Sequence, residues 1–127
     1  MNPLAADPNY DALMRANAMR VFSEPDSAKR LAAIAELWSP DGTFFEQQEE
    51  FSGHEAISAS VATLLRQLPP HTVFTPAGAA IGHHGVGLLR WTGGPGGGAP
   101  GPVTGTDIAI IKNGRIHSLY VFLDRTT

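Results

Sequence analysis

The 127-residue chain contains no cysteine, few charged residues and no long apolar run. Without cysteine, disulfide frameworks, thiolate nucleophiles and cysteine-ligated metals are excluded. The nine basic residues are scattered and the net charge is −3, which disfavours a nucleic-acid partner. No apolar run approaches a membrane span and the N-terminus lacks a signal-peptide pattern, so we expect a cytoplasmic protein with no membrane partner.

The composition predicts one small domain over residues 1–127, because 43% apolar residues suffice for one ordinary core. Residues 1–8 carry two prolines and small residues and predict a loose arm. Residues 92–102 are rich in glycine and proline and predict a flexible hairpin connection. A domain this small buries a modest share of its surface, so we expect a homodimer.

Apolar residues recur with helical spacing in three segments of the first half of the chain, at residues 10–21, 31–38 and 57–68. Ser23 is the predicted cap of the second helix, and Gly53 opens the third. A short strand over residues 43–47 precedes that third helix.

The second half predicts β-structure, in runs over residues 71–75, 79–91, 103–111 and 115–123. Asn113-Gly114 is a strong signal for a two-residue hairpin. Three helices with one strand among them, followed by an antiparallel meander, predict an α+β sheet-and-helix layer.

The family resemblance of the chain rests on the order and spacing of four short sequence motifs: LWSPDGTF at 37–44, GHEAI at 53–57, GTDIA at 105–109 and NGRI at 113–116. The chain resembles the nuclear transport factor 2-like superfamily, in its SnoaL-like and ketosteroid-isomerase-like branch. That resemblance implies a cone of cystatin-like fold, in which three helices pack on the concave face of a curved antiparallel sheet. It leaves the function open, because the superfamily hosts isomerases, cyclases, dehydratases, epoxide hydrolases and non-enzymes.

Asp107 is the foremost candidate for a catalytic residue. Strand alternation places Asp107, Ala109 and Ile111 on one face, where a buried carboxylate must raise its pKa or find a partner. The resemblance aligns Asp107 with the aspartic acid that, when protonated, stabilises an oxyanion in ketosteroid isomerases. Those enzymes are a standard example of a carboxylic acid that an apolar site keeps neutral. The alternative is an Asp near a strand end that accepts backbone hydrogen bonds.

Glu46 is the second catalytic candidate, and it shares a strand face with Phe44. The resemblance aligns it with the general base of ketosteroid isomerases, although that residue is an aspartate followed by proline and here Gln47 follows. The alternative is an exposed acid at the edge of a polar run. We expect Phe44 to contribute to the substrate-binding pocket beside it.

Further substrate-binding candidates are Asn17, Trp91, Tyr120 and His84. Asn17 lies on the apolar face of the first helix, where ketosteroid isomerases have a tyrosine that this chain lacks, so steroid isomerisation is in doubt. Asn17 or Tyr120 is the candidate replacement donor, with a helix-to-loop hydrogen bond as the alternative for Asn17. Trp91 is expected at the mouth of the cone.

The histidines predict no metal site, because His83 and His84 should point to opposite faces of one strand and no other pair has ligand spacing. One of the two is expected to face the pocket or the dimer surface, the alternative being a hydrogen-bonded sheet histidine.

Two hypotheses for function follow. The first is a cofactor-independent isomerase or cyclase that moves a proton beside the carbonyl of a small, mostly apolar compound, with Glu46 as base and Asp107 as acid. The second is a non-catalytic module of the same fold that binds a small molecule or dimerises.

Overall fold

The computed structural model describes residues 8–95 and 103–124. The arm predicted for residues 1–8 therefore lies outside the described residues except for its last position, as do residues 96–102 of the predicted glycine-rich connection. Within the described ranges, no helix is long and apolar enough to cross a membrane.

The first helical segment contains two kinds of helix. Helix α1 (Tyr10–Asn17) begins at Asn9, whose side chain accepts a hydrogen bond from the backbone N–H of Ala12. It continues into η2 (Ala18–Phe22), a π-helical turn that the apolar spacing did not predict. The wider turn places Ala18, Val21 and Phe22 together among the buried residues.

The other two helices agree with the sequence except at their ends. Helix α2 (Ser27–Leu37) is capped by the Asp26 side chain, so the prediction of Ser23 as its cap is wrong. The Ser23 hydroxyl instead donates to the Ala18 carbonyl and accepts from the Phe74 backbone N–H, joining η2 to the sheet. Helix α3 (His54–Gln67) starts after Gly53, as predicted.

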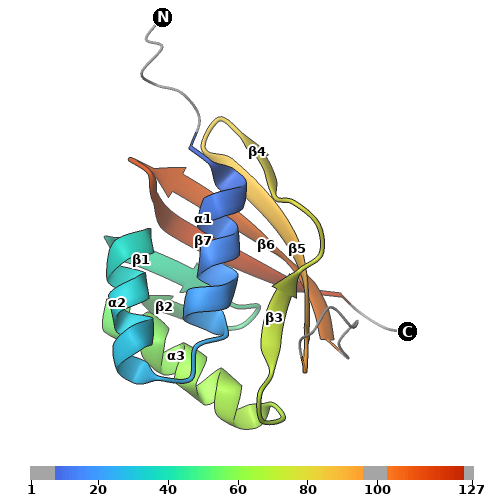
Figure 1. The fold of residues 1–127 in the computed structure, drawn as a ribbon. Helices are drawn as coiled ribbons and strands as arrows, with labels where there is room; N and C mark the ends of the chain where they lie inside the picture. The colour runs from blue at the N-terminus through green and yellow to red at the C-terminus, as the bar shows by residue number, and fades with distance from the viewer. Residues whose placement is uncertain (1–7, 96–102, 125–127) are drawn as a thin grey trace, which may run out of the picture.

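Seven strands form one curved, open sheet: β1 (Trp38–Phe45), β2 (Glu50–Ser52), β3 (Val73–Pro76), β4 (Ile81–His83), β5 (Val86–Gly94), β6 (Val103–Lys112) and β7 (Arg115–Leu123). Their order is β2-β1-β7-β6-β5-β3, and β4 pairs with β5 (Figure 1). The expected α+β class is confirmed. The sheet is mixed rather than antiparallel, because β1 pairs in parallel with β7.

The run predicted as one strand over residues 79–91 is two strands. His84 and Gly85 both have positive φ, 53° and 82°, as a two-residue hairpin turn of the primed type requires. The predicted connection at 92–102 begins later than expected, because residues 92–94 belong to β5. The Asn113-Gly114 hairpin is confirmed, with φ of 53° and 75°.

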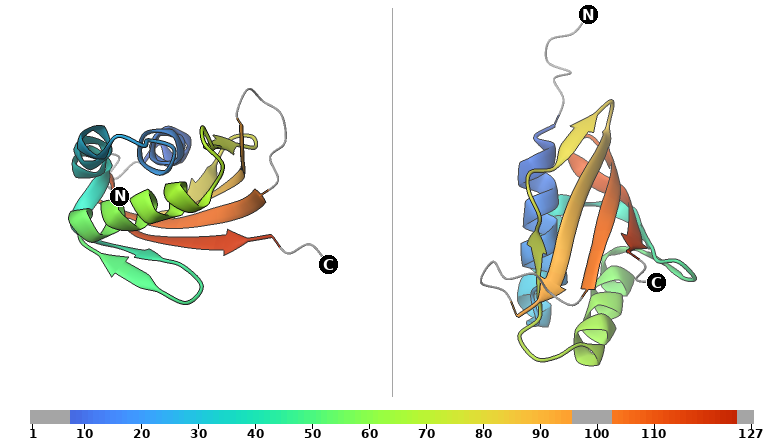
Figure 2. Two further views of the ribbon diagram at one scale, coloured as in Figure 1. Left: turned by 90° about the horizontal axis from the view of Figure 1, so that it is seen from below. Right: turned by 90° about the vertical axis from the view of Figure 1, so that its right-hand side faces the viewer.

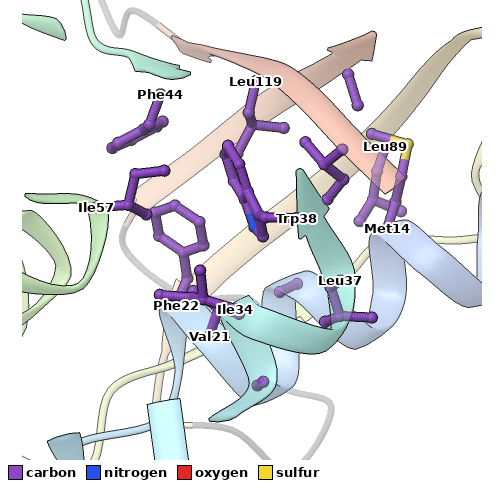
Figure 3. Close-up of a cluster of buried hydrophobic side chains, with 14 of the residues drawn as sticks. Met14, Val21, Phe22, Ile34, Leu37, Trp38, Phe44, Ile57, Leu89 and Leu119 are labelled. Carbon is purple, nitrogen blue, oxygen red and sulfur yellow. The ribbon is translucent and has the colours of Figure 1, made fainter. Parts of the chain in front are cut away.

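All three α-helices lie on one face of the sheet (Figure 2). The core between the two layers is centred on Trp38, which is fully buried among residues that include Phe22, Ile57 and Leu119 (Figure 3). Trp38 was predicted as the last residue of the second helix. It is extended and starts β1, because its large ring is buried between the layers there.

Candidate functional site

A cavity of about 870 Å³ lies between the helical layer and one end of the sheet. Its walls come from η2, the end of β1, the loop between β1 and β2, the C-terminal half of α3, and strands β3, β5, β6 and β7. The volume is within the range of drug-sized ligand sites. Asp107, Glu46, Phe44, Trp91 and Tyr120 all line it, so the structure brings together five of the seven predicted site residues.

Asp107 occupies the middle of β6 and faces the helical layer. Its strand neighbours on the same face, Ala109 and Ile111, are also buried, which confirms the predicted alternation. Across the sheet, Asp107 pairs with Leu89 of β5 on one side and Val121 of β7 on the other. The carboxyl group therefore sits in an apolar row and is only 7% exposed.

The indole of Trp91 is the hydrogen-bonding partner of Asp107. Its Nε1–H donates to Oδ1 of Asp107 over 2.9 Å. Trp91 pairs with Gly105 across the sheet, and a Cβ on Gly105 would lie 2.5 Å from the indole, so glycine leaves the space in which this ring lies. The ring of Phe74 packs edge-on against the indole, with 5.2 Å between centroids.

Of the two Asp107 carboxyl oxygens, only Oδ1 takes part in a hydrogen bond among the described residues. Asp107 is also one of the residues that line the cavity. A proton on this carboxyl belongs on Oδ2, because Oδ1 already accepts the indole N–H.

Burial raises the pKa of Asp107 from 3.8 to about 7, although the hydrogen bond from Trp91 acts in the opposite direction by stabilising the carboxylate. At neutral pH the protonated acid is therefore a major form of this group. A neutral carboxylic acid in an apolar site can donate a hydrogen bond to an oxygen on which negative charge develops.

Glu46 lies at the mouth of the same cavity. Glu46 directly follows Phe45, which pairs with Tyr120 of β7, so the same register places Glu46 beside Val121. Val121 in turn pairs with Asp107 of β6. The backbones of Glu46 and Asp107 are therefore two strand spacings apart, roughly 10 Å. Partial burial, and secondarily the charge of Glu49, raises the pKa of Glu46 above its usual value. The Glu46 backbone N–H donates to the Glu49 carbonyl over 2.8 Å and closes the loop.

Two predicted site residues lie elsewhere. Asn17 is buried, but its Oδ1 accepts a 2.8 Å hydrogen bond from Trp38 Nε1 in the core, and Asn17 does not line the cavity. His84 lies in the exposed turn between β4 and β5 and does not line the cavity either. Because His84 is in a turn, the prediction that it and His83 point to opposite faces of one strand is wrong, and their Nδ1 atoms are 2.8 Å apart.

Tyr120 contributes to the cavity wall from the other face of β7. Its neighbour Val121 pairs with Asp107, so alternation directs the Tyr120 ring away from the Asp107 side. The ring instead stacks on Phe45, with centroids 4.5 Å apart and planes at 7°. The hydroxyl of Tyr120 is therefore not positioned as a second donor beside Asp107.

Trp91 was predicted to line the cavity, but its position in the strand and its bond to Asp107 were not anticipated from the sequence, and neither were several other lining residues. Trp91 is buried in the interior of β5 rather than at a strand end, and its bond to Asp107 depends on the β5–β6 register. Gln47, Gln48 and Glu49 line the cavity, although the sequence alone suggested a solvated polar run. Their proximity to Asp107 follows from the pairing of β1 with β7, which no local pattern indicates.

In the described ranges, 8–95 and 103–124, no group of three or more histidine, aspartate or glutamate side chains could hold a metal ion. The cavity walls carry the carboxyl groups of Glu46, Glu49 and Asp107, and no lysine, arginine or histidine among the residues that the structure describes. The arrangement offers hydrogen-bond donation from a protonated acid, proton acceptance by a second carboxylate, and an apolar space between them.

Comparison with known proteins identifies the family and the fold. The family model described as SnoaL-like domain matches residues 19–119. A candidate isomerase of the SnoaL-like family from Agrobacterium tumefaciens superposes with a TM-score of 0.81 at 20% identity, covering 92% of this chain and 98% of that one.

Two further crystal structures are similar. A candidate polyketide cyclase from Sinorhizobium meliloti gives a TM-score of 0.65 at 20% identity, over 96% of this chain and all of that one (100%). A candidate ketosteroid isomerase from Kribbella flavida gives 0.68 at 12% identity, over 94% of this chain and 80% of that one. A search of curated proteins finds no match. At these identities the likenesses establish the fold.

Proposed function

The chain belongs to the SnoaL-like family, and from that premise we propose that it binds a small, mostly apolar carbonyl compound and catalyses proton transfer beside the carbonyl group. The observation that carries the proposal is the shared cavity: a buried acid, Asp107, and a second carboxyl group, Glu46, line the same apolar space. Acids in two different environments are the usual arrangement for general acid–base catalysis.

In the proposed reaction, the Glu46 carboxylate removes a proton from the carbon next to the carbonyl. The electrons of the broken C–H bond form the enolate double bond, and the carbonyl π electrons move onto oxygen. The Oδ2–H of Asp107 donates a hydrogen bond to that oxygen and stabilises its charge. Return of the proton from Glu46 to the same carbon gives exchange, and return to another carbon of the conjugated system gives an isomer.

The test is deuterium incorporation into a simple aromatic ketone, 2-tetralone, followed by NMR in D₂O. We expect exchange faster than in buffer, with Asp107→Asn and Glu46→Gln each lowering the enzymatic rate by about 10²-fold or more. The matched control is Glu50→Gln, because Glu50 lies in β2 and does not line the cavity. Ketone binding without exchange would overturn the catalytic proposal and favour the non-catalytic binding module.

We also propose a homodimer in which the sheet face opposite the helices packs on its counterpart. Gly82 and Gly87 face Tyr10 of α1, so alternation directs the neighbouring side chains to the opposite face of the sheet. Ile81, Val86 and Phe122 lie on that face and are 67%, 45% and 55% exposed. Exposed apolar side chains gathered on one face are typical of association surfaces.

A further inference from the structure

The charge on the cavity walls points to a class of ligand. Glu46 and Glu49 lie in the loop at its mouth, and Asp107 lies inside it. The only other polar side chains of the loop are the neutral amides of Gln47 and Gln48. The described walls carry no cationic side chain that could form an ion pair with a carboxylate, sulfonate or phosphate.

Two arginines among the described residues, Arg66 and Arg90, lie near this end of the molecule and make contacts outside the cavity. Arg90 extends from the outer face of β5 and lies 3.6 Å from Asp124. Arg66, in the last turn of α3, donates to the hydroxyl of Thr63. Neither lines the cavity.

The interior disfavours an anion. The aromatic rings of Phe22, Phe44, Phe74 and Trp91 are among the residues that line the cavity with Asp107. The rings of Phe22 and Phe44 are 5.0 Å apart and those of Phe74 and Trp91 are 5.2 Å apart, both edge to face. An anionic group that enters such a space loses its hydration without gaining a cationic partner.

We propose that the cavity selects an uncharged ligand over the anionic analogue of the same skeleton, because its walls carry the carboxyl groups of Glu46 and Glu49 and no described cation. This inference rests on the proposed ligand-binding role of the cavity and adds the charge class of the ligand. The carboxyl groups of Glu46 and Glu49 repel an anion bound in the cavity, and the interior gives it no counter-ion. For unit charges a few ångströms apart near a protein surface, this repulsion corresponds to at least a tenfold loss of affinity.

The experiment compares two fluorescent probes that differ by one charged group, N-phenyl-1-naphthylamine and 8-anilino-1-naphthalenesulfonate. We expect the wild-type protein to bind the uncharged amine at least about tenfold more tightly than the sulfonate. The double variant Glu46→Gln/Glu49→Gln should reduce this ratio by about tenfold, mainly by improving sulfonate binding. High salt should reduce the ratio in the wild type and have less effect in the variant.

The matched control is Glu50→Gln/Glu55→Gln, which removes the same two charges from positions outside the cavity and should leave the ratio unchanged. Val121→Trp, which fills the space beside Asp107, should weaken both probes and so locate their binding. Equal affinity for both probes in the wild type, an unchanged ratio in the Glu46→Gln/Glu49→Gln variant, or no binding of the amine would each overturn the inference. Because the readout is binding, charge selection without ketone exchange would overturn only the proposed reaction.

Discussion

Single residues set the chemistry of this site, and Asp107 has the most unusual surroundings. Its carboxyl group is held in an apolar row between Leu89 and Val121, with one hydrogen bond from Trp91. Desolvation and hydrogen bonding act in opposite directions on its pKa, and desolvation prevails. The acid thereby keeps a proton near neutral pH, at the expense of folding stability.

That stability penalty has a defined pH range. In the folded state the pKa of Asp107 is about 7, against 3.8 for the ordinary carboxyl, so between these values the folded state retains a proton that the unfolded state has lost. Stability contributed by this group therefore falls as pH rises from about 4 to about 7 and is constant above. The full effect is at most about 4 kcal/mol.

Asp107→Asn should remove this pH dependence, because the amide stays neutral while its oxygen can still accept the Trp91 N–H. In urea unfolding, we expect the variant to equal the wild type near pH 4 and to exceed it by a few kcal/mol at pH 8. The difference between the two proteins isolates the contribution of Asp107, because every other side chain is the same in both. A variant that is less stable than the wild type at pH 8 would mean that Asp107 has a structural role.

Trp91→Phe should raise the pKa of Asp107 further. The phenyl ring can occupy most of the indole site but cannot donate the hydrogen bond that stabilises the carboxylate. A carbon-13 NMR titration of the aspartate carboxyl groups would measure the change. Trp38→Phe, which removes an indole in the core, should leave this pKa in place, and a similar shift in both variants would contradict the assignment.

At the scale of elements, the junction between α1, η2 and β1 joins the core to the cavity. Asn17, at the end of α1, bonds to Trp38, at the start of β1, while the next residue, Ala18, lines the cavity. The hydrogen bond to the core is therefore made by the last residue of α1, and the contribution to the cavity wall is made by Ala18 and Phe22 of the wider π-helical turn that follows.

Asn17→Ala should therefore reduce stability without removing the site. Leaving the buried Trp38 N–H without an acceptor costs about 1–3 kcal/mol, to be measured as a lower free energy of unfolding in urea. Binding of N-phenyl-1-naphthylamine by the folded variant should match the wild type. A tenfold loss of probe affinity at unchanged stability would instead assign Asn17 to the ligand site.

At the scale of the whole molecule, the described helices lie on one face of the sheet and none of them covers the opposite face (Figure 2). Val86→Asp should convert the proposed dimer into monomers, because it places a charge among the exposed apolar side chains of the proposed interface. Light scattering at several protein concentrations would measure the mass. Leu31→Asp, on the exposed side of α2, is the control and should leave the mass unchanged.

Much of the architecture follows from local patterns in the sequence. Helical spacing identified three helical segments, the Asn113-Gly114 turn fixed the last hairpin, and alternation along β6 put Asp107 on the buried face. These features depend on residues close together in the chain, whose period and turn chemistry are determined by backbone geometry. The same local reasoning failed at His84, because a left-handed residue other than glycine or asparagine gives a weak turn signal.

That a carboxyl group would lie on a buried strand face could be predicted from local sequence, since alternation is a property of one strand. The surroundings of that carboxyl group depend instead on contacts between segments that are distant in the chain. The Trp91 bond requires the β5–β6 register and the space at Gly105, and the approach of Glu46 requires the parallel pairing of β1 with β7. Register and packing between distant segments arise when all the apolar faces are buried together, so no local stretch of sequence encodes them.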